Sequence, residues 1–186
     1  MISIKNHENA IFKLFNYEKL TKQFESDPKK GLKTFPITIE GKSLIENFQA
    51  EVTTNGISAH SWDNGITSYS LGIRLIDEDY YGHIDQLVQK LAEKLPDDFE
   101  TTSPVKGESI YLKLKLKADK KTFTTKTNIK INAGKYQEAD ITRTQDLMVK
   151  LEFFAYVDIF NKRAGIAVTP IELTFQEKKK VQYHSL

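Results

Sequence analysis

The sequence predicts a mostly β protein of the α+β class, folded as a closed antiparallel barrel with one main helix and an N-terminal helical arm. Apolar and polar residues alternate with period two in several segments, whereas one segment has strong helical spacing. Strands outnumber helices by about six to two, which leaves too few helices for a doubly wound sheet. Closing a barrel removes exposed sheet edges, and this favours it over the alternative, an open antiparallel sheet with a helix on one side.

The length of 186 residues fits one domain. We expect an N-terminal arm over residues 1–32, the barrel over 33–176 and a basic tail over 177–186. Aromatic residues make up 11% of the chain, which together with the long apolar patterns excludes a disordered chain. No segment approaches the roughly 18 apolar residues of a membrane span, and residues 1–8 lack the apolar core of a secretion signal.

The first half of the chain contains the arm, three predicted strands and the main helix. Apolar residues near helical spacing over 11–20 predict a short helix that a turn ends. The strands predicted in this half cover residues 33–40, 44–52 and 67–76, with a loop over 55–65. The helix over 79–95 repeats apolar residues at spacings of three and four and stops before Pro96. The acids over 77–79 suit its N-terminus, where free N–H groups favour negative charge.

The second half of the chain is rich in strands. A polar loop over 97–107 comes first. The predicted strands then cover residues 110–117, 122–131, 147–160 and 166–175. The segment Asn161-Lys162-Arg163-Ala164-Gly165 predicts a hairpin turn between the last two of them.

Catalytic motifs are poorly represented. Cysteine is absent, which excludes disulfide scaffolds, thiolate metal sites and cysteine nucleophiles and suits a reducing compartment. The histidines at 7, 60, 83 and 184 lack metal-ligand spacing, and no nucleophile or phosphate-loop motif occurs. Asp77, Glu78 and Asp79, together with Asp63, are the one candidate cluster for a Mg²⁺-dependent nuclease. Consecutive acids between a strand and a helix are more typical of a solvated helix start, so we expect no catalytic residue, metal or cofactor.

Charge is distributed unevenly along the chain. Residues 1–100 contain 11 basic and 16 acidic residues, a net charge of −5, whereas residues 101–186 contain 16 and 9, a net charge of +7. On the strand over 110–117, Tyr111, Lys113, Lys115 and Lys117 share the face opposite the apolar one. Such a stripe indicates either a surface for a polyanion or an edge strand that lysines guard against aggregation.

The strand over 147–160 favours the polyanion. Its odd-numbered positions form an apolar face, so Phe154, Tyr156 and Phe160 are expected on the outward face with Lys150. Further candidates in the neighbouring turns are Lys120, Lys121, Phe123, Lys126, Lys162 and Arg163. Rings stack on any base and lysines follow the phosphates, so this mixture is typical of proteins that bind single-stranded nucleic acid.

The order of these elements resembles the OB-fold single-stranded DNA-binding proteins of bacteriophages and large DNA viruses. The segments that carry the resemblance are residues 70–75, 79–95, 110–117, 127–131, 147–156 and 165–173, so it covers about residues 66–175. It implies an OB-like barrel closed by the last hairpin, with an inserted helix packed on it. Phage members often end in an acidic tail that recruits replication partners, whereas residues 177–186 are basic, so that role is not carried over.

We therefore expect a protein without enzyme activity that binds single-stranded DNA without strong sequence preference, in viral or phage replication, recombination or repair. The pattern leaves DNA and RNA open, because recognition of the 2′-hydroxyl has no readable motif. Replication proteins and a second copy of the chain are candidate partners, a membrane is not, and the cytoplasm or nucleus of the infected cell is the expected location. The alternatives are a structural or protein-interaction module with a lysine-guarded edge and, more weakly, the nuclease.

Overall fold

The fold was determined as a computed structural model, which describes residues 2–12, 17–27, 31–61, 63, 65, 67–114, 128–131, 134–135 and 141–176. The helical elements are η1 (Ile4–Asn9), α1 (Tyr17–Ser26) and α2 (Asp79–Ala92). The strands of the first half are β1 (Ala10–Phe12), β2 (Leu32–Ile39), β3 (Lys42–Ser43), β4 (Ile45–Val52), β5 (Ser58–Ser61) and β6 (Thr67–Leu75). The strands of the second half are β7 (Glu100–Thr102), β8 (Val105–Lys106), β9 (Ser109–Leu114), β10 (Asn128–Ile131), β11 (Gly134–Lys135), β12 (Asp146–Asp158) and β13 (Arg163–Phe175).

Long elements with clear periodicity are where the sequence predicts them, and short ones are not. The main helix and the strands β2, β4, β6, β9, β12 and β13 are confirmed, with shifts of a few residues at their ends. The apolar pair Ile11 and Phe12 was expected in a helix but lies in β1, because these residues pair with Thr38 and Ile37 of β2. The predicted loops over 55–65 and 97–107 contain the short strands β5, β7 and β8, whose polar sequences carry no apolar alternation.

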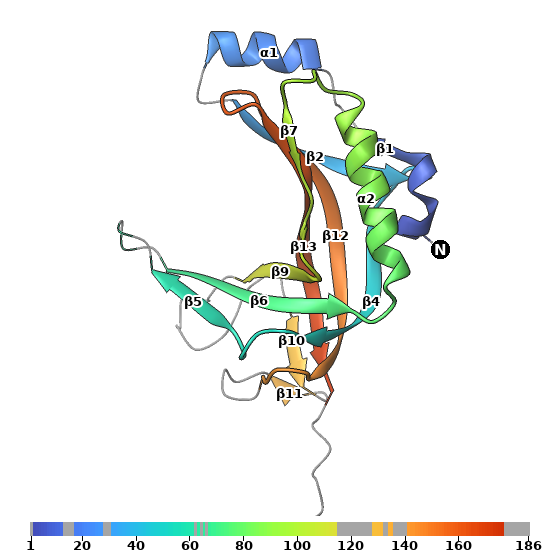
Figure 1. Cartoon of the computed structure of the whole chain (residues 1–186), viewed down its shortest axis with the longest axis vertical. Coiled ribbons are helices and arrows are strands. Elements are labelled where there is room, and N and C mark those ends of the chain that lie inside the picture. Colours follow the sequence, from blue (N-terminus) through green and yellow to red (C-terminus); the bar gives the residue numbers. More distant parts are fainter. Residues whose placement is uncertain are drawn as a thin grey trace, which may run out of the picture.

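Within the described residues, thirteen strands form one continuous hydrogen-bonded system, mostly antiparallel, with the main path β11-β10-β13-β12-β4-β6-β9-β8. The strands β7 and β10 run parallel to β13, at its two ends. No hydrogen-bonded pairing in this part of the chain joins β8 or β9 back to β13, so the ring is not closed by hydrogen bonds. Figure 1 shows β6 and β9 running across β12 and β13.

Strand β12 is the centre of the sheet. One edge pairs with β13 over its whole length, and the other edge is shared by β4 over residues 146–152 and by β2 over residues 154–158. Between these two partners the chain folds back on β2 through a turn in which Glu40 and Gly41 both have positive φ, and β3 pairs with the end of β2. At Leu44, between β3 and β4, the carbonyl accepts a hydrogen bond from the N–H of Phe153 of β12 at 3.0 Å.

The core lies on the odd-numbered face of β12. Its side chains from Leu147 to Val157 alternate between buried and half-buried positions, as the parity of the sequence predicts. Helix α2 buries Ile84, Leu87 and Leu91, and its Tyr80 meets the ring of Phe48 edge-on with centroids 4.8 Å apart. Phe48 in turn contacts Phe153. The helix therefore packs on the side of the odd-numbered core face.

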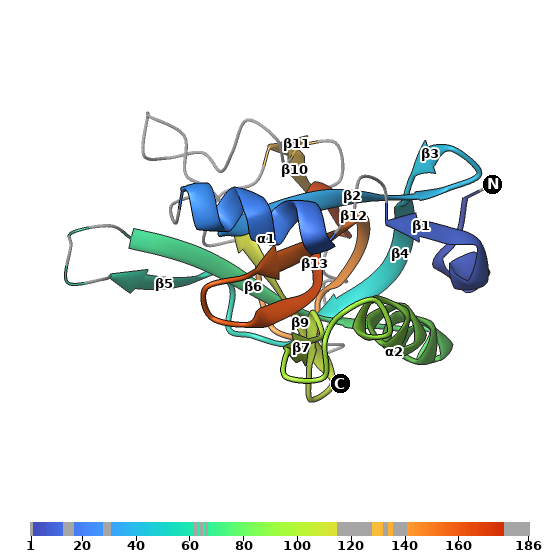
Figure 2. The ribbon, with the colours of Figure 1, turned by 90° about the horizontal axis from the view of Figure 1, so that it is seen from above.

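The first residues pack against the body of the protein. The carboxylate of Glu46 accepts hydrogen bonds from the Ser3 hydroxyl and the Ile4 N–H, both at 2.7 Å, and Ile4 is completely buried. The Lys90 ammonium of α2 donates to the carbonyl of Glu8 at 2.7 Å. Figure 2 shows η1, β1 and α2 together on the side of the molecule opposite β5. The N-terminal segment is thus a layer of the fold up to β1. No helix among the described residues is long and apolar enough to span a bilayer.

Candidate nucleic-acid interface

A groove of about 610 Å³ lies where β9 faces the middle of β13. We call it the aromatic groove. Its lining residues belong to β6, to the continuous segment from β7 through β9, to β12 and to β13. Helix α2 contributes no lining residue. The described residues that line it are Ser70, Thr102, Ser103, Pro104, Lys106, Tyr111, Lys113, Phe154, Tyr156, Ile166, Ala167, Val168, Thr169 and Pro170.

Three aromatic side chains reach this groove from two strands. Tyr111 projects from β9 and is 48% exposed, and Phe154 and Tyr156 project from β12 and are half-buried. All three occupy the face opposite the core, as the parity of their strands predicts. The groove therefore brings Tyr111 together with two rings that lie more than forty residues later in the sequence.

Each groove tyrosine lies across from a glycine on the neighbouring strand. Tyr111 pairs with Gly72, and Tyr156 pairs with Gly165. A Cβ atom added to Gly165 would lie 2.9 Å from Cε1 of Tyr156, and one added to Gly72 would lie 3.3 Å from Cε1 of Tyr111. The absence of a side chain at these two positions lets both rings lie close over the sheet.

The ring of Tyr156 is also held at its outer end. Its hydroxyl forms a hydrogen bond with the hydroxyl of Thr102 on β7. Thr102 is in turn the register partner of Gly165, so the ring, the glycine and the threonine form one packed unit. A ring fixed in this way loses little conformational entropy when a ligand stacks on it.

The charges in the aromatic groove are of one sign. Lys106 of β8 and Lys113 of β9 are exposed and line it, and the described lining residues include no carboxylate. Lys106 was missed by the sequence analysis because it lies in a segment that has the composition of a polar loop. The sequence could have indicated the role of Gly72 and Gly165, because an isolated glycine in a strand often marks a place where another group approaches the backbone closely.

Among the described residues, the groove also follows two sheet edges that are only partly paired. On the edge of β13 that faces away from β12, pairing with β7 ends at Gly165 and pairing with β10 begins at Glu172, and the described residues place no strand along this edge at Ile166–Thr169. On β9, pairing with β8 covers only Ser109 and Ile110. Backbone donors and acceptors in such edges are available to a ligand.

Four other predicted site residues lie outside the groove. Lys150 is half-buried on β12 between Asn47 and Glu172, and Phe160 is 71% exposed in the turn that joins β12 to β13. Lys162 donates to Asp98 at 2.7 Å, and Arg163 lies 3.8 Å from Glu100. The predicted residues Lys115, Lys117, Lys120, Lys121, Phe123 and Lys126 lie outside the described part of the chain.

Lys162 of the β12–β13 turn and Asp98 form an ion pair in which each side chain favours the charged form of the other. The hydrogen bond from Lys162 lowers the pKa of Asp98, and the same bond raises the pKa of Lys162. Both side chains are more than half exposed, so solvent screens the attraction. A phosphate that approached Lys162 would have to compete with this carboxylate, which makes the turn a weaker anion site than the groove.

The acids over 77–79 lie at the start of α2. The carboxylate of Asp77 accepts a hydrogen bond from the N–H of Asp79 at 3.1 Å, and Glu78 lies 3.7 Å from Arg74. In the described ranges, no group of three or more histidine, cysteine, aspartate and glutamate side chains is placed to hold a metal ion. The search of protein-family models, the search of curated proteins and the search of solved structures each found no match to this chain.

Proposed function

We propose that this protein binds single-stranded nucleic acid, DNA in the first place, in the aromatic groove and without strong sequence preference. The observation that carries the proposal is the composition of the groove: Tyr111, Phe154 and Tyr156 line it together with Lys106 and Lys113, and its described lining contains no carboxylate.

The chemistry of an unpaired strand matches this lining. Every base has two apolar faces, and stacking on an aromatic side chain contributes about 1–3 kcal/mol per base irrespective of the base. The phosphates need cations along the same path, and lysine supplies them without geometric constraint. In a duplex the base faces are already stacked, so a groove of this kind selects single strands.

The proposed architecture around the groove is an OB-type barrel. In support, the long strand β12 is central, and β6 and β9 cross β12 and β13 (Figure 1). The groove is lined by residues of β9 and β12 that lie on the face opposite the core. The resemblance to phage and viral proteins suggests a role in replication, recombination or repair. There the protein would protect exposed strands and remove hairpins, with no chemical step.

The proposal is tested by fluorescence anisotropy with a labelled oligothymidine, a matched duplex and an RNA of the same length. We expect the single strand to bind and the duplex to bind much more weakly. Phe154→Ala should weaken binding about five- to a hundredfold, the loss of one stacked base, while the matched control Phe160→Ala leaves the affinity unchanged. A large fall in thermal stability with normal affinity of the folded fraction would instead make Phe154 a packing residue.

The open edges support a second candidate, a protein-interaction module. An extended peptide could add a strand beside Ile166–Thr169, with Lys113 near the edge of β9. No binding of any oligonucleotide would favour this candidate. Cleavage of the oligonucleotide that depends on Mg²⁺ would favour the nuclease, for which the described residues contain no three-ligand cluster.

A further inference from the structure

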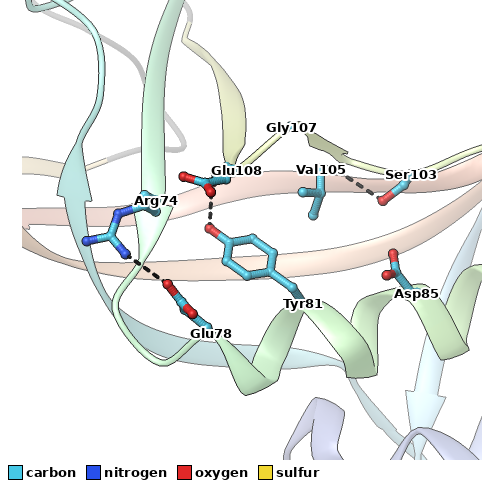
Figure 3. Close-up of a pocket in the computed structure, with 8 residues that line it drawn as sticks. All are labelled: Arg74, Glu78, Tyr81, Asp85, Ser103, Val105, Gly107 and Glu108. Atoms are coloured by element: carbon cyan, nitrogen blue, oxygen red, sulfur yellow. Dashed lines mark hydrogen bonds and ion pairs between the residues drawn. The ribbon is translucent and has the colours of Figure 1, made fainter.

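A second cavity, of about 430 Å³, lies next to the aromatic groove. We call it the acidic cavity. Ser103 lines both, so the two cavities adjoin at the chain between β7 and β8. Figure 3 shows its lining, which comprises Arg74, Glu78, Tyr81, Asp85, Ser103, Val105, Gly107 and Glu108.

The β8–β9 hairpin separates the two cavities, with a basic residue of the hairpin on one side and an acidic residue on the other. Lys106 lines the aromatic groove, and two residues later Glu108 lines the acidic cavity. Lys106 pairs with Ser109, so Gly107 and Glu108 alone form the loop, and Gly107 has a φ of 64°. Glycine adopts this conformation without strain, which keeps the two-residue loop tight.

The acidic cavity carries an excess of negative charge. Among the described residues, its lining includes the carboxylates of Glu78, Asp85 and Glu108 and one cation, Arg74. The guanidinium of Arg74 is already engaged: it donates two hydrogen bonds to Glu51, at 2.8 and 3.0 Å, and lies 3.7 Å from Glu78. Little of its positive charge is therefore left for a phosphate.

The wall between the cavities is held in place by Tyr81 of α2. Its hydroxyl donates to the carbonyl of Glu108 at 2.8 Å (Figure 3) and accepts from the N–H of Leu75, also at 2.8 Å. Burial raises the pKa of Tyr81, so the hydroxyl remains a proton donor at neutral pH. Asp85 points from the next turn of α2 toward the chain at Ser103. The hydrogen bonds of Tyr81 thus connect α2, which carries Asp85, to the hairpin that carries Glu108.

We propose that the acidic cavity is an electrostatic boundary that ends the path of the bound strand at Ser103. This inference rests on the proposed function. A phosphate that passed from the aromatic groove over the hairpin would lie within about one Debye length, roughly 10 Å at 0.1 M salt, of Glu108 and Asp85. Repulsion there directs the strand away from α2 at this end of the groove and limits the number of nucleotides that each molecule covers.

The test compares the wild type with the double variant Glu108→Gln, Asp85→Asn on oligothymidines of increasing length. Both carboxylates are exposed, so the fold should persist, which a melting curve checks. Short oligomers that fill the groove should bind both proteins almost equally. On longer oligomers the variant should gain affinity, by about two- to fivefold at low salt, and the length at which affinity levels off should increase.

The matched control is Glu93→Gln combined with Asp97→Asn, which removes two exposed carboxylates at and just beyond the other end of α2. An equal gain in this control, or no gain in the double variant while the wild type binds oligothymidine, would overturn the boundary and leave the proposed function intact. Failure of the wild type to bind any oligomer would overturn both. A gain that persists unchanged at 1 M salt would also contradict the inference, because screening should remove it.

Discussion

At the scale of single residues, the groove depends on two positions that have no side chain. Gly165 and Gly72 admit the rings of Tyr156 and Tyr111, and neither glycine has a positive φ. Their role is therefore one of space and not of backbone conformation. The threonine that pairs with Gly165 then fixes the Tyr156 ring by its hydroxyl.

We expect Gly165→Ala to lower the free energy of unfolding by about 1–3 kcal/mol, the usual cost of overpacking. The new methyl group would overlap the Thr102 hydroxyl and lie 2.6 Å from the Thr102 carbonyl oxygen and 2.9 Å from Tyr156 Cε1, so both residues or the strand itself must shift. Urea unfolding measures the loss, and anisotropy on the folded variant should show weaker binding because Tyr156 is displaced.

The control for this substitution is Gly82→Ala. A Cβ at Gly82 meets no atom within 4 Å, and the residue lies inside α2. Alanine there should stabilise the protein by up to about 1 kcal/mol, because glycine is unfavourable in a helix interior. A Gly165→Ala variant as stable as the wild type would show that the sheet absorbs the methyl group and that the ring is not confined by this glycine.

At the scale of elements, the turn between β12 and β13 is tied to the loop before β7 by the ion pair of Lys162 and Asp98. Because the folded pKa of Asp98 is below its unfolded value, this pair stabilises the fold fully above the unfolded pKa. The contribution is lost as the pH falls through the folded pKa. Asp98→Asn should therefore cost stability at neutral pH and progressively less below about pH 4.

This prediction is checked by urea midpoints of the wild type and Asp98→Asn between pH 2.5 and 7. The two curves should converge at the acid end. Since both side chains are more than half exposed, 1 M salt should reduce the difference at neutral pH as well. A difference that stays constant down to pH 2.5 would mean that Asp98 acts through something other than its charge.

Elements with strong periodicity were predictable, and the contacts between them were not. The alternation in β9 and β12 places Tyr111, Lys113, Phe154 and Tyr156 outward from local sequence alone, because the pleat fixes the side of each residue. The same rule could not show that β9 faces β13. Lys162 and Arg163 were expected to bind the strand, yet Asp98 and Glu100 lie beside them because β7 runs along β13.

At the scale of the whole molecule, the charges are separated around the β8–β9 hairpin, with lysines on one side and carboxylates on the other. We expect Lys106→Ala combined with Lys113→Ala to flatten the plot of log affinity against log salt by about 1.4, since each phosphate contact on a single strand contributes about 0.7. The measurement is anisotropy on oligothymidine between 50 and about 300 mM salt.

A control with the same loss of charge is Lys162→Ala combined with Arg163→Ala. Both of these residues have acidic neighbours and lie outside the groove, so the slope should change little. Equal slopes for the two double variants would indicate that the strand responds to total charge and not to the groove.

The position of β12 has a consequence for the order in which the protein can form during synthesis. Phe154 of β12 pairs with Pro36 of β2, more than a hundred residues earlier in the sequence. Strand β4 pairs with the same distant strand. The N-terminal third therefore leaves the ribosome long before β12, the strand that β2 and β4 share as a neighbour, exists. Such long-range pairing is slow to form and leaves strand edges exposed to aggregation in the meantime. The fold of this protein is completed only when β12 and β13 have been translated.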